Sequence, residues 1–236
     1  MHITTISFNL PLRESQIPVF KQAILEIPGI DQELYNNKLT GPNGVEKNIN
    51  DYPPVQYRVY EGHASLWALN KGAVQLEKDL KKKKLQRFFW EGREREFALV
   101  RHFTNASESC TYLAAGKYME YRLHNYLPLS AESHKEYSQA KDIYKKIAIL
   151  ERLLVSHLVL FSYAAGWELK PKQLLKAKIV DILAITEGVY KKYDPQKAKH
   201  YIKFDLLVKI NAHLPDGISI GNQKSLGYGV LEKLEE

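Results

Sequence analysis

A glycine-rich segment near the C-terminus contains residue types that hold phosphate groups. Residues 216–232 include four glycines together with Lys224 and Ser225. Glycine lets a backbone approach a ligand closely, and exposed amides in such a loop form a concavity that suits phosphate oxygens. Lys224 adds a point charge. The spacing differs from that of a P-loop, so a glycine-rich hairpin that binds no ligand stays an equal alternative.

Histidines are the other candidates for chemistry, because imidazole gains or loses a proton near neutral pH. His63 lies at the tip of a predicted hairpin, where it either reaches a groove or is an exposed turn residue. His124 shares a predicted strand face with Arg122 and Tyr126, which is either an RNA-facing or a solvent-facing set. His157 lies beside the apolar stripe of a predicted helix, which favours a packed histidine over a catalyst.

The composition indicates a basic, cytoplasmic protein with a real hydrophobic core. The 236 residues are 44% hydrophobic, and the formal charge of +7 mildly favours polyanionic partners. The single Cys110 excludes an intrachain disulfide and a cysteine-based zinc cluster. The eight histidines show no metal-binding motif, so we expect no metal or other cofactor. We also expect no signal peptide and no membrane-spanning run.

The first part of the chain predicts half of a ferredoxin-like domain. β-Branched and aromatic residues predict strands over 2–10, 55–60 and 64–69, and apolar spacing predicts helices over 17–27 and 70–80. The resulting order, strand–helix–strand–strand–helix, is that of a ferredoxin-like half-domain. The lysine run 81–84 precedes several arginines and is either solvated surface or part of a basic stripe.

The second part predicts a less regular unit of the same kind. The expected elements are strands over 118–127, 176–183, 201–212 and 228–234 and a long helical tract over 131–165. We therefore predict an α+β protein of two tandem ferredoxin-like, RRM-type domains, residues 1–115 and 116–236, with the glycine-rich loop near the C-terminus.

The residues Ser225-Leu-Gly-Tyr-Gly-Val230 resemble the glycine-rich loop of the CRISPR-associated endoribonucleases that cut repeat RNA. These enzymes are the Cas-six branch of the repeat-associated RNA-binding superfamily. Upstream, Ser219-Ile-Gly221 stands where that family has Gly-x-Gly. Further resembling segments follow in the family's order: 17–24, 52–57, 149–166 and 213–216.

This resemblance implies binding of CRISPR repeat RNA by two ferredoxin-like domains. It also implies a metal-independent cut, in which a 2′-hydroxyl attacks the adjacent phosphate and leaves a cyclic phosphate and a 5′-hydroxyl. The glycine loop and the polar strand face are expected to hold the RNA. The candidate RNA-binding residues are Gly221, Asn222, Gln223, Lys224, Ser225, Gly227, Gly229, Arg122 and His124.

The segment after the first helix departs from the family pattern. The branch that this chain most resembles has Leu-Phe-His-Asn-His, with the histidines as acid and base, whereas Leu34–Lys38 reads Leu-Tyr-Asn-Asn-Lys. Asparagine at position 36 can position a group but cannot act as a base. Lys38 and Lys47 can stabilise a phosphorane, and Tyr35 is a weak acid. The candidate catalytic residues are thus Tyr35, Asn36, Lys38 and Lys47.

Three hypotheses follow from the sequence. The first is a repeat-RNA endoribonuclease that cuts slowly without metal, because in-line positioning supplies much of the rate. The second is a non-catalytic repeat-RNA-binding protein, motivated by the missing histidines. The third is an assembly scaffold, which the +7 charge and the loop weakly oppose. A CRISPR effector complex and a second copy of the chain are the further partners considered.

Overall fold

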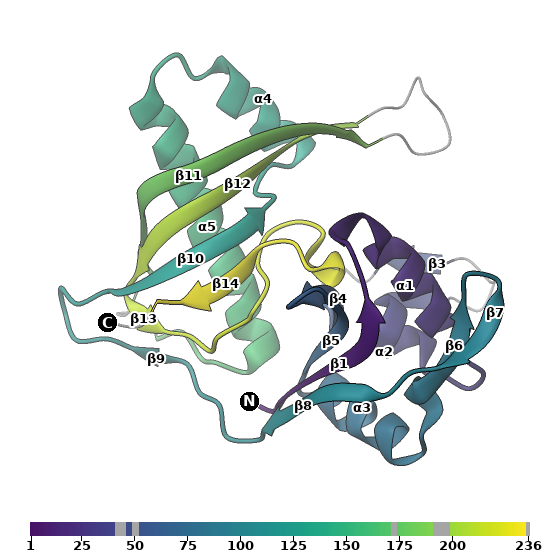
Figure 1. Cartoon of the computed structure of the whole chain (residues 1–236). Helices are drawn as coiled ribbons and strands as arrows, with labels where there is room; N and C mark the ends of the chain where they lie inside the picture. The colour runs from purple at the N-terminus through teal and green to yellow at the C-terminus, as the bar shows by residue number, and fades with distance from the viewer. Residues whose placement is uncertain (41–45, 49–51, 171–173, 191–198, 235–236) are drawn as a thin grey trace. The chain divides into compact units, whose positions relative to one another are not determined.

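The computed structural model describes residues 1–40, 46–48, 52–170, 174–190 and 199–234. Backbone contacts divide the chain into two units. The first unit comprises Met1–Glu108 with Ser225–Gly227, and the second comprises Ser109–Lys224 with Tyr228–Glu236. The division along the chain thus lies between Glu108 and Ser109, whereas the sequence predicted a boundary between 115 and 116. Each unit contains helices and one main antiparallel sheet (Figure 1).

The first unit has the strand order of a ferredoxin-like fold. Its main sheet contains β1 (Ile3–Pro11), β4 (Val55–Tyr60), β5 (His63–Leu69) and β8 (Leu99–Asn105), in the spatial order β4-β5-β1-β8. Helix α1 (Ile17–Leu25) lies between β1 and β4 in the chain, and α3 (Lys71–Lys81) lies between β5 and β8. Chain order and sheet order together match the split βαβ arrangement.

Shorter elements fill the connections of this unit. They are the 3-10 helices η1 (Glu14–Gln16) and η2 (Lys84–Gln86), helix α2 (Gln32–Asn36), and strands β2 (Lys38–Thr40), β3 (Glu46–Asn48), β6 (Arg87–Trp90) and β7 (Arg93–Glu96). Strands β2 and β3 pair with each other, as do β6 and β7. These hairpins extend the unit beyond the simple ferredoxin-like pattern.

Aromatic packing explains why α1 covers the first sheet. Phe20 of α1 is fully buried and meets Phe8 of β1 edge-on, with ring centroids 5.9 Å apart. Tyr57 of β4 lies 5.8 Å from the Phe20 ring in the same kind of geometry. Edge-to-face pairs at this spacing add to the free energy gained by burying the rings themselves.

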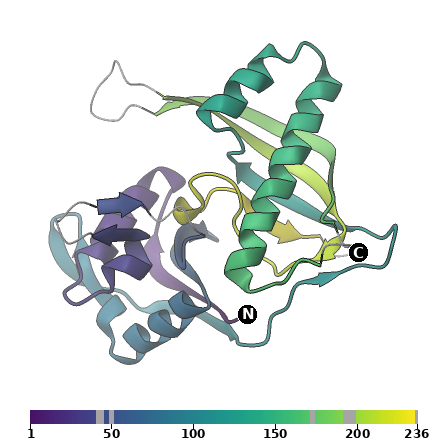
Figure 2. The same ribbon diagram turned by 180° about the vertical axis from the view of Figure 1, so that it is seen from behind.

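The second unit repeats the strand order with one helix replaced. Its main sheet contains β10 (Met119–Tyr126), β11 (Ala177–Tyr190), β12 (Lys199–Ile210) and β14 (Val230–Lys233), in the order β11-β12-β10-β14. Helices α4 (Ala131–Gln139) and α5 (Ile143–Ala165) lie on one face of this sheet (Figure 2). The glycine-rich segment, with the 3-10 helix η4 (Lys224–Leu226), stands between β12 and β14 in place of a second helix. A small sheet pairs β9 (Thr111–Tyr112) with β13 (Ala212–His213).

The helical tract predicted over 131–165 is two helices. Ala140 has an extended backbone, and Asp142 caps α5 by accepting a hydrogen bond from the Lys145 amide at 2.8 Å. A capping aspartate satisfies an amide that a continuous helix would have paired internally. Asp142 therefore favours the start of a second helix at Ile143.

Helix α5 is long and apolar enough to cross a membrane by length and composition. The sequence led us to expect no such run. Its residues Leu150, Leu154, Leu158 and Phe161 are at most 1% exposed, and this regular stripe is typical of the core helix of an α+β unit.

Both main sheets therefore carry ferredoxin-like topology, and the predicted fold class is confirmed.

Candidate functional site

The glycine-rich segment is folded, and all of it except Ser225–Gly227 groups with the second unit. Ser219 forms an isolated bridge with Val230. The Ile220 amide donates to the Gly229 carbonyl at 2.8 Å, and the Leu231 amide donates to the Ile218 carbonyl at 2.8 Å. These bonds double the chain back on itself, so the loop between them has a defined shape before any ligand binds.

Two glycines of this loop are required by close approach of other atoms. At Gly229, φ is +70°, and a Cβ would lie 1.8 Å from the Ile220 carbonyl oxygen. At Gly221, φ is +92°, and a Cβ would lie 2.8 Å from the Tyr126 ring. The Gly229 amide donates to the Asn125 carbonyl at 3.1 Å. The sequence predicted that this amide holds RNA, but it is engaged within the protein, so Gly229 shapes the loop instead.

The polar residues between these glycines differ in what they bind. The Asn222 amide donates to the Leu127 carbonyl at 2.9 Å, and its side chain donates to the Leu129 carbonyl at 3.2 Å. Asn222 therefore anchors the loop. Gln223 is exposed with φ of +57°, and the Lys224 ammonium lies 3.4 Å from the Gly221 carbonyl. This places a positive charge at the glycine turn.

Ser225 and Gly227 complete the predicted RNA-binding set. Both are partly exposed, and Gly227 has φ of +75°. Ser225 lies in η4, directly after Lys224. Their contribution to RNA binding stays a proposal.

His157 lies within electrostatic reach of Lys224, which the sequence alone does not show. Its Nδ1 is 2.8 Å from the hydroxyl of Tyr126, a fully buried residue of β10. Burial, and then the positive charge of Lys224, lower the pKa of His157 to about 4. The imidazole is neutral at pH 7 and satisfies a buried hydroxyl, which agrees with the packing role that the sequence favoured.

This pairing makes the second unit sensitive to acid. The folded pKa of about 4 lies below the value of about 6.5 for an unfolded histidine, so the unfolded chain binds the extra proton in this range. The stabilisation is complete above pH 6.5 and is lost as the pH falls toward 4. We expect urea unfolding to report roughly 2–3 kcal/mol less stability at pH 4.5 than at pH 7 from this residue. The variant His157→Gln should show a smaller loss, and an equal loss in both proteins would contradict the assignment.

Strand β10 presents only part of the predicted polar face. Arg122 is exposed, and His124 Nε2 lies 2.6 Å from Glu232 Oε2 on β14. Tyr126 instead faces the core, because Asn125 has φ of +51° and the pairing register with β12 shifts between Leu123 and Tyr126. Such a bulge reverses the alternation of side chains. Arg122 and His124 remain accessible, and the prediction that Tyr126 shares their face is wrong.

Tyr35 occupies a buried position in the first unit. The side chain is 1% exposed, and its hydroxyl donates to Asp79 Oδ2 at 3.1 Å. Burial, and then the charge of Asp79, raise the pKa of this hydroxyl far above its usual value. A phenol that holds its proton this strongly and contacts a core carboxylate serves packing, so we do not retain Tyr35 as a catalytic acid.

The other predicted catalytic residues follow Tyr35 in α2 and in the β2–β3 hairpin. Asn36 ends α2, and its carbonyl accepts a hydrogen bond from Lys21 Nζ at 3.4 Å. Lys38 and Lys47 lie on the β2–β3 hairpin, whose register pairs Lys38 with Asn48 and Leu39 with Lys47. The side chains of Lys38 and Lys47 lie outside the described part of the chain.

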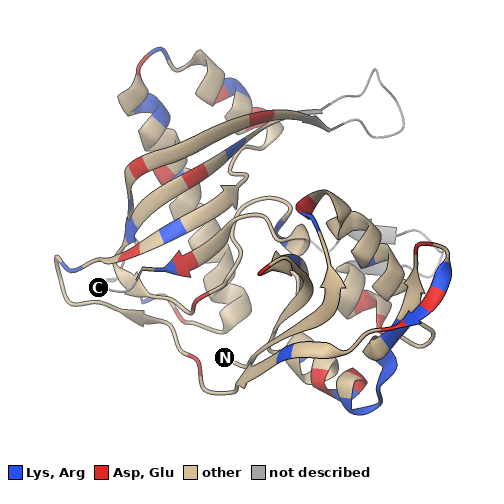
Figure 3. Ribbon diagram, in the orientation of Figure 1, with Lys and Arg blue, Asp and Glu red and all other residues tan. Residues whose placement is uncertain are grey.

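The sequence offered a basic stripe over residues 81–101, but this surface carries both basic and acidic side chains. Figure 3 shows Lys and Arg gathered at the end of α3 and over β6–β7, with acidic residues among them. Lys84 is tied down by the Gly29 carbonyl at 2.9 Å and lies 3.8 Å from Asp79. Arg87 pairs with Glu96 at 3.3 Å. These carboxylates neutralise part of the basic charge. Of the lysine run, Lys81–Lys83 are exposed.

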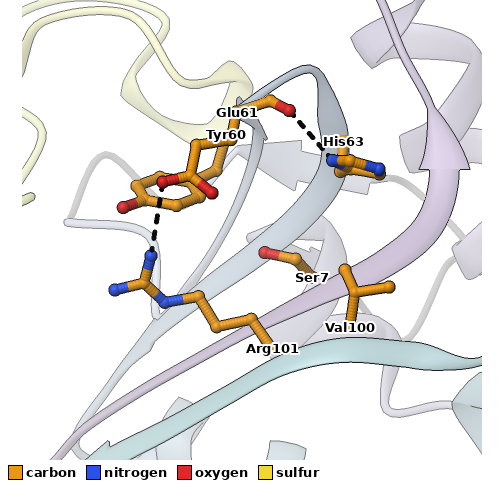
Figure 4. Close-up of a pocket in the computed structure, with 6 residues that line it drawn as sticks. All are labelled: Ser7, Tyr60, Glu61, His63, Val100 and Arg101. Carbon is orange, nitrogen blue, oxygen red and sulfur yellow. Dashed lines mark hydrogen bonds and ion pairs between the residues drawn. The ribbon is translucent and has the colours of Figure 1, made fainter.

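A cavity of about 210 Å³ in the first unit contains several polar groups. It is lined by Ser7, Tyr60, Glu61, His63, Val100 and Arg101 (Figure 4). His63, which the sequence predicted at a hairpin tip, is partly exposed and lines this cavity; its functional role stays a prediction. The other lining residues come from β1, β4, β8 and the β4–β5 turn, so no local motif marks them.

The comparisons with known proteins agree with the fold. Residues 113–234 match the family model described as the Cas6b C-terminal domain. A crystal structure of Cas6b has a TM-score of 0.72 and 17% identity, and the match covers 99% of this chain and 100% of that one. A crystal structure of the CRISPR RNA processing endoribonuclease Cas6b has a TM-score of 0.65 and 17% identity. That match also covers 99% of this chain and 100% of that one.

A more distant structure is that of Csf5, a type IV CRISPR-Cas Cas6 crRNA endonuclease. Its TM-score is 0.62 at 12% identity, over 100% of both chains. No curated protein matches the sequence. These structural likenesses establish the fold, and the family model adds the relationship. Because the residues that match the family model make up more than half of the sequence, this chain belongs to the Cas6b family.

Proposed function

We propose that this protein binds CRISPR repeat RNA and cuts it without a metal ion. The observation that carries the proposal is the match of residues 113–234 to the Cas6b C-terminal domain. A pre-shaped glycine loop with Lys224 at its turn supports it, because such loops accommodate phosphate groups. We further propose that the protein acts in the cytoplasm. An effector complex that receives its product and a second copy of the chain are the partners that we propose.

The reaction is an internal transesterification. The 2′-oxygen forms a bond to phosphorus while the bond to the leaving 5′-oxygen breaks, which produces a 2′,3′-cyclic phosphate and a 5′-hydroxyl. The protein must hold the 2′-oxygen in line and stabilise the crowded phosphorane. Lys224, Gln223, Ser225 and the backbone around Gly221 and Gly227 would hold the RNA backbone, with Arg122 and His124 as further contacts.

The hairpin β2–β3 supplies cations rather than an acid–base pair. We assign Lys38 and Lys47 to phosphate contacts, with Asn36 as a hydrogen-bond donor. Lysine is a compact point charge that binds phosphate well, whereas asparagine has no titratable proton. This division leaves the proton transfers to other residues.

A non-catalytic repeat-RNA-binding protein is the second candidate. Asn36 and Lys38 stand at the positions where the resembling branch has histidines, and Tyr35 is buried against Asp79. An RNA-binding protein that does not cut would bind repeat RNA with the same loop and give no product.

Replacing Lys224 tests the RNA-binding part of the proposal. We expect Lys224→Ala to weaken binding of the repeat RNA about tenfold, which is about 1.4 kcal/mol. The slope of log K against log salt should also flatten by about 0.7–0.9, because one phosphate contact is lost. Fluorescence anisotropy with labelled repeat RNA at several salt concentrations measures both quantities.

Lys135→Ala is the matched control, because Lys135 is an exposed lysine of α4 in the same unit. It should change neither quantity. Unchanged affinity and slope in Lys224→Ala would remove the loop from the RNA-binding surface.

A further inference from the structure

The cavity of the first unit brings together a carboxylate, an imidazole and a guanidinium. Glu61, His63 and Arg101 line it together with Tyr60, Ser7 and Val100 (Figure 4). At about 210 Å³ it is smaller than the pockets of about 300–1,000 Å³ that enclose whole small ligands. Its size suits one phosphate group and the ribose oxygens beside it. Metal-free cleavage of RNA needs a base, an acid and a cation at such a group.

Sheet register brings these residues to one place. Ser7 of β1 pairs with Ser65 of β5 on one side and with Arg101 of β8 on the other. Paired residues of neighbouring strands present their side chains on the same face. His63 lies two residues before Ser65 and therefore on that face, where it pairs with Tyr60. The fold thus assembles the cavity from the four strands of one sheet and from the turn between β4 and β5, which holds Glu61.

Hydrogen bonds orient the His63 ring. Nδ1 lies 2.9 Å from the Glu61 carbonyl oxygen, and a carbonyl only accepts, so Nδ1 carries a proton. Nε2 is then the nitrogen left for a partner in the cavity, and in the imidazolium form it is the one that can give a proton away. The Ser65 hydroxyl donates to the His63 carbonyl at 3.1 Å, so the Ser7 hydroxyl must donate in the 2.8 Å bond between the two serines.

The charged groups of Arg101 and Glu61 are both accessible and lie near each other. The Arg101 guanidinium lies over the Tyr60 ring, with 4.4 Å between Cζ and the ring centroid. Its Nη1 is 4.0 Å from Glu61 Oε1, and the two side chains are 46% and 73% exposed. At this separation and exposure the ion pair is weak, so the guanidinium can also bind a phosphate while the Glu61 carboxylate stays nearby.

We propose that this cavity holds the scissile phosphodiester of bound RNA, with Glu61 as the general base and His63 as the general acid. Glu61 takes the proton of the 2′-hydroxyl while the 2′-oxygen bonds to phosphorus. The bond from phosphorus to the 5′-oxygen breaks, and this oxygen takes the proton from His63 Nε2. The proton on Glu61 returns to His63 through solvent, which restores both groups. Arg101 stabilises the negative charge of the phosphorane.

This inference rests on the proposed function and names the groups that stand in for the family histidines. Asn36 and Lys38 offer no proton donor–acceptor pair for this reaction, whereas Glu61 and His63 do. The assignment predicts that Lys38 affects RNA affinity and that Glu61 and His63 affect the rate of cleavage.

Conservative variants separate chemistry from docking. His63→Asn keeps an amide donor for the Glu61 carbonyl but has no basic nitrogen, and Glu61→Gln keeps the shape of the carboxylate without its charge. We expect each to slow single-turnover cleavage of repeat RNA in EDTA about 100-fold or more while the dissociation constant changes less than about threefold. His102→Asn is the control, because His102 is an exposed histidine on the opposite face of β8, next to Arg101.

A modified RNA identifies the acid. A substrate with sulfur in place of the leaving 5′-oxygen needs no protonation of the leaving group, because a thiolate leaves unaided. His63→Asn should cut this RNA at nearly the rate of the unmodified protein, and Glu61→Gln should stay slow. Equal rates for all variants on the natural RNA, or a loss of affinity that accounts for the whole defect, would overturn the proposal. Failure of the unmodified protein to cut repeat RNA would instead refute the proposed function, and this inference with it.

Discussion

Replacing Gly229 by alanine should destabilise the second unit more than other single changes in the glycine loop. The new methyl group would lie 1.8 Å from the Ile220 carbonyl oxygen, at a φ of +70°. The backbone must shift, which breaks the bonds from Ile220 to Gly229 and from Gly229 to Asn125. We expect a loss of about 3–5 kcal/mol in the free energy of unfolding, measured by urea denaturation.

Gly116→Ala is the matched control for this change. Gly116 has a φ of +80° in the same unit, and no atom beyond its chain neighbours lies within 4 Å of the place that its new methyl group would take. It should lose only about 1–2 kcal/mol, the ordinary strain of a left-handed alanine. Equal losses in the two variants would show that the loop adapts freely and has no fixed shape.

Replacing Asp79 by alanine should have the second large effect, in the first unit. Asp79 is 1% exposed, accepts hydrogen bonds from Tyr35 at 3.1 Å and from Gln75 at 3.0 Å, and lies 3.8 Å from Lys84. Its removal leaves a buried hydroxyl without this acceptor and takes away the carboxylate beside Lys84. We expect a loss of about 3 kcal/mol in the free energy of unfolding, whereas Asp79→Asn, which keeps an acceptor oxygen, should lose less.

Tyr35→Phe completes the test of this network. It should lose about 1 kcal/mol alone and little more when Asp79 is already alanine, because the two residues share one hydrogen bond. The same variant should keep the rate of RNA cleavage. A large loss of cleavage rate with unchanged stability would instead indicate that Tyr35 is a catalytic residue.

Much of the fold was predictable because local patterns and tertiary contacts agree. The strand predicted over 55–60 has the same bounds in the structure, and α3 begins one residue after the predicted start. Strand β8 was missed because it is an exposed edge strand whose charged residues look like surface. The break between α4 and α5 depends on a single capping aspartate, Asp142, within an otherwise helical pattern.

The candidate site was less predictable because it depends on geometry that sequence spacing does not contain. The face of Tyr126 is reversed by the backbone of one residue, Asn125. The engagement of Gly229 with Asn125 joins segments far apart in the chain. Likewise, Arg101 and His63 line one cavity because β1 lies between β5 and β8 in the sheet, and no motif records that order.

The most direct test of the proposed function is incubation of the unmodified protein with repeat RNA in EDTA, followed by chemical identification of the product ends. We predict a single cut that leaves a 2′,3′-cyclic phosphate on one fragment and a 5′-hydroxyl on the other. Tight, salt-sensitive binding with no product would contradict the nuclease and leave an RNA-binding protein. Absence of both binding and cleavage would contradict the assignment to repeat RNA altogether.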